Sequence, residues 1–259
     1  MSTLLIRLEG PMQSWGIQSQ FARRDTSLEP SKSGVIGLLC AALGRPRSAD
    51  LSDLAALRMG VRVDRQGTVR SDYHTAGGTN RTNRIGRTDT SNYGVAAFDG
   101  SKPGTVLSTR FYLADASFLV GLEAATPVQE HLLEQLDVAL ARPVWPLFLG
   151  RKAFVPSLPV RLPDVPPIGP GLQASGLEKA LSDYPWPEAR AGEIVRKPPS
   201  QLRLVIEEDI PMTGESRMDV PVSFLPLDRR YQSRYVRTEF MHRPPSATTV
   251  VDPEIAAEE

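Results

Sequence analysis

The pattern of apolar and polar positions predicts a chain of mixed strands and helices. Alternation of apolar and polar residues is typical of half-buried strands. It predicts strands over residues 4–9, 61–69, 110–123, 202–207 and 220–225. The 61–69 segment alternates around Gly67, which we interpret as a hairpin, and residues 115–117 suit a turn inside 110–123.

Helical spacing and end signals predict four helices. Residues 127–140 carry the clearest amphipathic pattern, with Pro127 in the first turn. A second helix spans the apolar run from Ser31 to Gly44, because serine is a good N-cap and glycine accepts the left-handed conformation that ends a helix. Two shorter helices are expected over residues 52–59 and 177–184.

One segment does not fit either pattern. Residues 75–105 are rich in Gly, Thr, Asn, Ser and Arg and contain few side chains that pack as core, so we expect a protruding hairpin or thumb-like arm. The element order suits an α+β fold, with a ferredoxin-like, RRM-type βαββαβ core that carries this arm. We expect the core over 1–185, a β-rich part over 186–243 and a disordered acidic tail over 244–259.

Composition removes several functional classes. No apolar run approaches the length of a membrane span, and the single cysteine, Cys40, allows no internal disulfide, so we expect a cytoplasmic protein. Three widely separated histidines give no zinc-ligand spacing, and we expect no metal, no cofactor and no catalytic residue. The net charge is zero, but residues 1–120 hold 15 Lys and Arg against 10 Asp and Glu, which allows a basic face.

Several short motifs follow one another in a recognisable order. They lie at residues 10–16 (GPMQSWG), 31–39 (SKSGVIGLL), 72–75 (DYHT), 112–118 (YLADASF) and 146–151 (PLFLGR), with a weaker one at 179–184 (KALSDY). In this order and at these separations the chain resembles the CasD group of the Cas-five family of CRISPR-associated proteins. Residues 186–243 and the acidic tail carry none of the motifs.

The resemblance implies a function and a set of partners. Members of this group are non-catalytic subunits of the type I-E Cascade surveillance complex that hold the 5′ handle of the crRNA and cap the backbone filament, in support of antiviral defence. The implied partners are crRNA, the filament subunit CasC and the large subunit CasA, with target DNA reached only through the complex.

The candidate RNA-binding residues are polar or basic and lie in or beside these motifs and the arm. They are Gln13, Ser14, Lys32, Ser33, Tyr73, His74, Arg81, Arg84, Arg87, Arg151 and Lys152. A helix N-terminus attracts phosphate, and closely spaced arginines without nearby carboxylates favour contact with an RNA backbone. Trp15 suits core packing slightly better than base stacking. The Lys32 side chain is either exposed to solvent or in contact with a phosphate. Tyr73 and His74 either pack as a hinge at the base of the arm or contact RNA.

Two other functions remain open at the level of sequence. Some relatives cut the CRISPR repeat without a metal, and His74, Tyr73 and Lys152 supply the residue types for a metal-independent endoribonuclease. The adjacent Lys-His pair of the cleaving members is absent, however. A purely structural subunit is the third possibility, if the arginines of the arm bind protein.

Overall fold

The computed structural model describes residues 1–16, 22–77, 81–82, 88–89, 95, 104–164, 169–187, 199–208 and 214–246. The strands of the main sheet are β1 (Ser2–Gln13), β2 (Arg23–Arg24), β3 (Arg58–Arg65), β4 (Thr68–Ala76), β7 (Val106–Ala124), β8 (Leu172–Gln173), β9 (Gln201–Glu208), β10 (Glu215–Leu225) and β11 (Asp228–His242). Their order is β10-β11-β9-β3-β7-β1-β8, and β2 and β4 also pair with β7. The fold is mixed α/β, with a large, mostly antiparallel sheet and few helices.

The two longest helices begin and end close to where the sequence predicts. They are α1 (Lys32–Leu43), α2 (Ser52–Ala55), α3 (Pro127–Ala141) and α4 (Leu177–Asp183). Ser31 caps α1 by accepting a hydrogen bond from the Gly34 N–H, and Gly44 ends it at φ 71°. Thr126 and Gln129 form a capping box at the start of α3. Helix α2 is shorter than the predicted 52–59, because the chain already enters β3 at Arg58.

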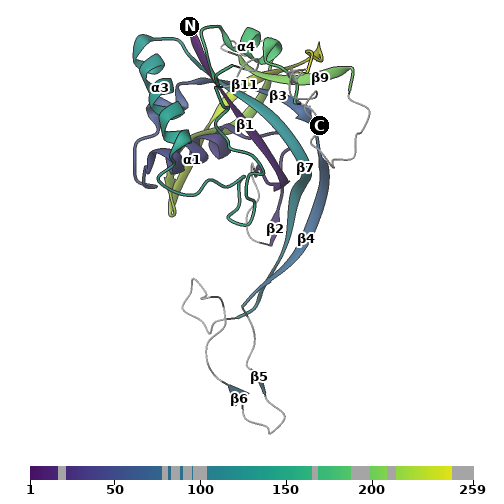
Figure 1. Ribbon diagram of the computed structural model, residues 1–259. Helices are drawn as coiled ribbons and strands as arrows, with labels where there is room; N and C mark the ends of the chain where they lie inside the picture. The colour runs from purple at the N-terminus through teal and green to yellow at the C-terminus, as the bar shows by residue number, and fades with distance from the viewer. Residues whose placement is uncertain are drawn as a thin grey trace, which may run out of the picture.

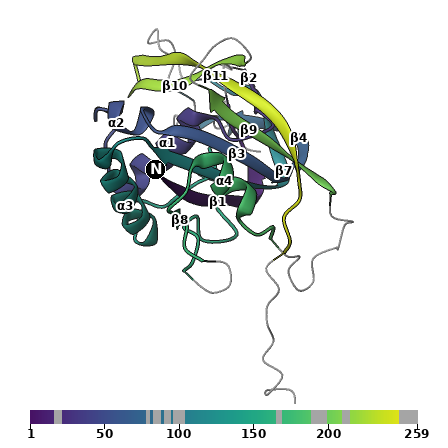
Figure 2. The ribbon, with the colours of Figure 1, turned by 90° about the horizontal axis from the view of Figure 1, so that it is seen from above.

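The sheet is covered on both faces, which explains the weak alternation of its first strand. Leu4, Ile6 and Leu8 of β1 belong to the main core beneath α1 and α3, whereas Leu5 packs into a smaller cluster with α4 (Figure 2). A strand that is apolar on both sides reads as a continuous run rather than as an alternation. None of the described helices is long and apolar enough to cross a membrane.

Strands β3 and β4 correct the predicted hairpin around Gly67. Both pair antiparallel with β7, β3 along residues 117–123 and β4 along residues 106–114. They are therefore two halves of one broken strand that runs beside β7 in a single direction. The prediction of a turn at 115–117 is also wrong, because β7 continues through these residues. Asp115 lies in the left-handed region of backbone conformation, at φ 58°.

Strand β4 and residues 106–114 of β7 leave the body together, so the arm includes this paired ribbon and begins nearer to the body than the predicted residues 75–105 (Figure 1). Beyond them the backbone of β5 (Arg81–Thr82) pairs with β6 (Thr88–Asp89). The C-terminal strands do not form a separate layer, since β9 pairs with β3 and extends the sheet of the body. The tail predicted to be disordered over 244–259 is described only to residue 246, where the Pro245 carbonyl accepts from the Trp186 N–H at 3.2 Å, and the rest lies outside the described residues.

Candidate nucleic-acid interface

The β4–β7 ribbon has two chemically different faces. Residues directly opposite each other in an antiparallel pair share a face, and successive residues alternate between faces. Asp72 pairs with Arg110 and His74 with Ser108, which places them on one face. Tyr73 pairs with Thr109, which places it on the other. The adjacent Tyr73 and His74 are therefore separated by the ribbon.

The first of these faces is strongly basic. We call it the cationic face and define it by four arginines: Arg24, Arg70, Arg110 and Arg151. Arg24 joins it through the parallel pairing of β2 with β7, where it lies beside Arg110. Arg24 and Arg70 are exposed, and Arg110 and Arg151 are half-buried. Within the described part of the chain none of the four forms an ion pair with a carboxylate.

Three of these arginines lie close enough for their charges to interact. The pKa of Arg151 is lowered, first by burial of its guanidinium and then by the positive charges of Arg110 and Arg24, and Asp72 opposes this effect. Arg110 donates from Nε to the Ser108 hydroxyl at 3.0 Å. Four arginines against one carboxylate, Asp72, leave this face with a net positive charge that attracts a polyanion.

The loop that carries Arg151 is fixed against the start of the ribbon. Arg151 donates from Nη2 to the Phe111 carbonyl at 2.8 Å, and its guanidinium lies 5.4 Å from the centre of the Phe154 ring. Gly150 adopts φ 90°, and a Cβ there would lie 1.8 Å from the Ser14 carbonyl oxygen. Lys152 follows on the exposed side of this loop. The absence of a side chain at Gly150 thus lets the loop pack against the protein backbone.

The second face of the ribbon is apolar and aromatic. Tyr73 is 69% exposed there, and Val69 and Leu107 are also exposed. The Arg23 guanidinium lies 5.0 Å from the centre of the Phe111 ring on the same side. Tyr73 can therefore offer a ring surface to a base, whereas His74 lies on the cationic face with Nδ1 3.6 Å from Asp72 Oδ2.

The predicted sites at residues 13 and 14 are buried. Gln13 is 0% exposed, and its Nε2 donates to the carbonyls of Leu8 and Ala116. Its Oε1 accepts from the Trp15 indole, which is itself in the core. The Ser14 hydroxyl donates to the Phe111 carbonyl at 3.2 Å. These side chains tie the end of β1 to the ribbon, so we assign them structural roles and leave them out of the interface.

Lys32 is also internal. Its side chain is 2% exposed, and its Nζ lies 2.8 and 2.9 Å from the two carboxylate oxygens of Glu207. Its backbone N–H donates to Asp219, which forms a paired contact with Arg234. Burial lowers the pKa of Lys32, and the charge of Glu207 opposes this effect. The predicted phosphate contact of Lys32 does not fit this position.

The rest of the first-helix motif is also explained by packing. Ser33 is half-buried, and its hydroxyl lies 3.4 Å from that of Ser31. A Cβ at Gly34 would lie 2.8 Å from the ring of Trp15. Trp15 thus packs in the core, as the sequence slightly favours, and the small residue at 34 makes room for its ring.

The arm arginines are the remaining candidates. Arg81 lies on the short strand β5, where the structure describes its backbone only. Arg84 and Arg87 lie outside the described residues. Their contact with RNA stays a prediction.

Comparison with known proteins identifies the family. The family profile described as CRISPR-associated protein (Cas_Cas5) matches residues 3–237. The chain belongs to the Cas5 family of CRISPR-associated proteins. It is 33% identical over 195 residues to the CRISPR system Cascade subunit CasD of Escherichia coli (strain K12), an alignment that covers 71% of this chain and 77% of that protein.

Two solved structures resemble this chain over nearly its whole length. One, titled "Crystal structure of Cas protein", has a TM-score of 0.67 and 41% identity and covers 94% of this chain and 98% of its own. The other, titled "CRISPR RNA-guided surveillance complex", has a TM-score of 0.69 and 34% identity and covers 93% and 91%. The resemblance inferred from the motifs is confirmed.

Sequence reasoning missed three of the four arginines of the cationic face in this Cas5 chain: Arg24, Arg70 and Arg110. The signal was present as a period of two, since Arg70, Asp72 and His74 alternate along one strand and Ser108 and Arg110 along another. It becomes visible only when the two strands are paired in register.

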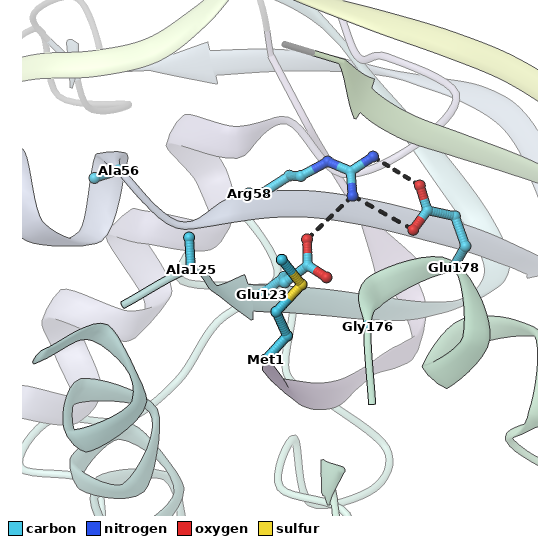
Figure 3. A pocket seen from close by; sticks show the side chains of 7 residues that line it. All are labelled: Met1, Ala56, Arg58, Glu123, Ala125, Gly176 and Glu178. Carbon is cyan, nitrogen blue, oxygen red and sulfur yellow. Dashed lines mark hydrogen bonds and ion pairs between the residues drawn. The ribbon is translucent and has the colours of Figure 1, made fainter. Parts of the chain in front are cut away.

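One pocket of about 360 Å³ lies near the start of β1, at the far end of the sheet from the arm (Figures 1 and 3). Its charged groups already pair with one another, because Arg58 contacts Glu123 at 3.0 Å and Glu178 at 2.7 Å. The described residues contain no group of three or more His, Cys, Asp or Glu that could hold a metal. Neither feature adds to the interface.

Proposed function

We propose that this chain is a non-catalytic subunit of a Cascade surveillance complex, and that it binds the 5′ handle of the crRNA on the cationic face. The observation that carries the proposal is the set of four arginines without a carboxylate partner in the described structure, at the start of the arm. The CasD relative and the surveillance complex support the assignment to Cascade.

The cationic face suits a single-stranded RNA backbone. Arginine is always charged and presents its donors in a planar fork that matches phosphate. Asp72 repels phosphate and lies beside His74, so it limits how closely the backbone can approach this part of the ribbon. Exposed Tyr73 on the opposite face can stack on a nucleotide that passes around the edge of the ribbon.

The arm and the core complete the proposal. Arg81, Arg84 and Arg87 would extend the basic surface away from the body along the guide RNA. We also assign the set β1, α1, β3, β7, α3 and β8 to a ferredoxin-like core. The β-α-β-β-α-β order and the strand order β8-β1-β7-β3 support this assignment.

The proposed partners follow from membership of the complex. We propose that the chain contacts the filament subunit CasC and the large subunit CasA, and that it meets target DNA only through the assembled complex. Copurification of the tagged full-length chain with the other Cascade subunits and crRNA tests this part. Recovery of crRNA without CasC would contradict the proposal that this chain caps the end of the backbone filament.

Cleavage of repeat RNA is the alternative activity. A base and a cation must reach the same phosphate. His74 shares the cationic face with the arginines and stays the candidate base, whereas Tyr73 lies on the opposite face and cannot act beside it. His74→Ala should leave repeat processing in the full complex unchanged. A fall of more than about tenfold would favour the ribonuclease, since a general base supplies at least roughly a hundredfold.

Binding to labelled RNA that carries the 5′ handle tests the main proposal. The full-length chain is incubated with the RNA in EDTA, and the affinity is measured over a series of salt concentrations. Combined substitution of Arg24, Arg70 and Arg110 by Gln should lower the slope of log K against log salt by about 2, at roughly 0.7 per lost single-strand contact.

A matched control removes surface charge elsewhere. Arg47 and Arg142 are exposed and lie away from the ribbon, next to α1 and α3. Their substitution by Gln should leave the slope unchanged. Cleaved RNA would indicate the ribonuclease, absence of binding would indicate a purely structural subunit, and equal slopes for both variants would refute the cationic face as the site.

A further inference from the structure

At the boundary between body and arm, two residues on neighbouring strands adopt the left-handed backbone conformation. The broken strand is interrupted at Gly67, with φ 72°, and its neighbour β7 has Asp115 at φ 58°. A Cβ at Gly67 would lie 2.7 Å from the Ala114 carbonyl oxygen and 2.9 Å from the Ala116 Cβ. The two interruptions are thus packed directly against each other.

Asp115 is the only residue other than glycine with a positive φ among those the structure describes. Such a conformation is unfavourable for most side chains, but Asp tolerates it better than most. The residues of β7 before it pair with β4, and those after it pair with β3. The left-handed residue therefore marks the point where β7 passes from the sheet of the body into the arm.

A single side chain connects the three strands at this point. Arg65, the last residue of β3, donates from Nε to the Asp115 carbonyl at 2.8 Å. Its Nη2 lies 3.2 Å from Asp115 Oδ1 and 3.5 Å from Oε1 of Glu9 on β1. Glu9 is buried and also accepts from the Ser117 hydroxyl at 2.8 Å, so one anchor of this cluster is fixed in the body.

We infer that Arg65 and Asp115 are positioning residues that set the direction of the arm, and thereby hold the cationic face where the guide RNA passes. The inference rests on the proposed function only for its RNA part. Without the Asp115 carboxylate, Arg65 keeps its contact with Glu9 and its hydrogen bond to the carbonyl of residue 115 but loses the ion pair across the boundary. The paired strands then bend more freely at the two left-handed residues.

Substitutions of Asp115 and Arg65 separate the backbone from the ion pair. Asp115→Gly removes the carboxylate and keeps the left-handed conformation without strain. Asp115→Asn also tolerates that conformation and keeps an oxygen that can accept from Arg65. Glycine also frees the backbone at 115, so Arg65→Met, which removes the contact and leaves residue 115 unchanged, should broaden the distance distribution as Asp115→Gly does if the contact is the cause.

The direction of the arm is measured without RNA. Spin labels are attached to cysteines introduced at Thr105, which is exposed directly before β7, and at Val128, which is 80% exposed on α3. Native Cys40 is buried. The full-length protein and the Asp115→Asn variant should give one narrow distance distribution, and Asp115→Gly should give a broad one.

Affinity for the handle RNA is the second measurement. Asp115→Gly should bind about fivefold more weakly, the effect of losing a partly exposed ion pair of roughly 1 kcal/mol, and Asp115→Asn should bind like the unsubstituted chain. A narrow distribution for Asp115→Gly would overturn the inference, and so would a broad one with undiminished affinity. If no variant binds RNA, the proposed function fails, while the distances still decide whether this contact directs the arm.

Discussion

Lys32 offers the sharpest test of the structure, because its sequence context and its position predict different behaviour. Lys32→Met keeps the length of the side chain and removes the positive charge that pairs with Glu207. Loss of one partner from a buried ion pair costs about 3–5 kcal/mol. We expect about 3 kcal/mol, the low end, because Glu207 keeps the Met59 N–H at 3.0 Å and Arg234 at 3.4 Å.

Denaturation by urea and by heat measures this cost. A loss of about 3 kcal/mol corresponds to a fall in Tm of roughly 6–12 °C for a chain of this size. Lys179→Met is the matched control, because Lys179 is 72% exposed and pairs with Asp183 one turn along α4. Such a surface pair contributes about 0.5 kcal/mol or less. In the Glu207→Gln background, Lys32→Met should lower the free energy of unfolding by less than it does in the unsubstituted protein, since the two side chains interact directly.

The same variants decide between the two roles of Lys32. An internal role predicts reduced stability, with the salt dependence of handle-RNA binding unchanged in conditions where the variant is folded. A phosphate contact predicts the reverse, with stability like that of the control and a salt slope lower by about 0.7. The second result would show that the ion pair with Glu207 is not what holds Lys32.

Three further predictions concern the loop, the thiol and the arm. Gly150→Ala should destabilise the protein by at least about 2 kcal/mol in urea unfolding, because strain and a clash with Ser14 combine, whereas Gly169→Ala, with φ 75° and no neighbour within 4 Å, should cost about 1 kcal/mol. Burial raises the pKa of Cys40 from 9.0 to about 11, so a thiol reagent at pH 8 should react with it only on unfolding. This shift stabilises the fold below pH 9 and the stabilisation is lost as the pH rises through about 11, which a pH series of urea midpoints checks. Replacement of Arg81, Arg84 and Arg87 together by Ala should leave the Tm unchanged and lower the RNA salt slope by about 2; full affinity at every salt concentration would contradict a role in RNA binding.

The local features of the fold were predictable, because their causes are local. The caps at Ser31, Gly44 and Thr126 act within one turn of helix, so the ends of α1 and α3 can be inferred from a few neighbouring residues. The family resemblance was equally accessible, since its motifs are short and contiguous.

Long-range pairing explains what could not be predicted. Gly67 between two alternating segments is typical of a hairpin, and only the pairing of both halves with β7 shows a broken strand. Lys32 lies 175 residues from Glu207, so no local pattern indicates its ion pair. Strand β11 was missed because one of its inward positions is Arg234, whose charge interrupts the expected alternation.

The two faces of the arm have a consequence for how such a protein tolerates insertions and deletions. Because a strand alternates its side chains with a period of two, a deletion of one residue between Leu107 and Leu113 would shift part of β7 to the opposite face, so that Ser108 and Arg110 no longer both lie on the face that holds Arg70 of β4. Residues added beyond Ala76, at the far end of the ribbon, change its reach and leave this alternation intact. The length of the arm can therefore diverge freely among related chains, whereas the parity of the β4–β7 pairing cannot.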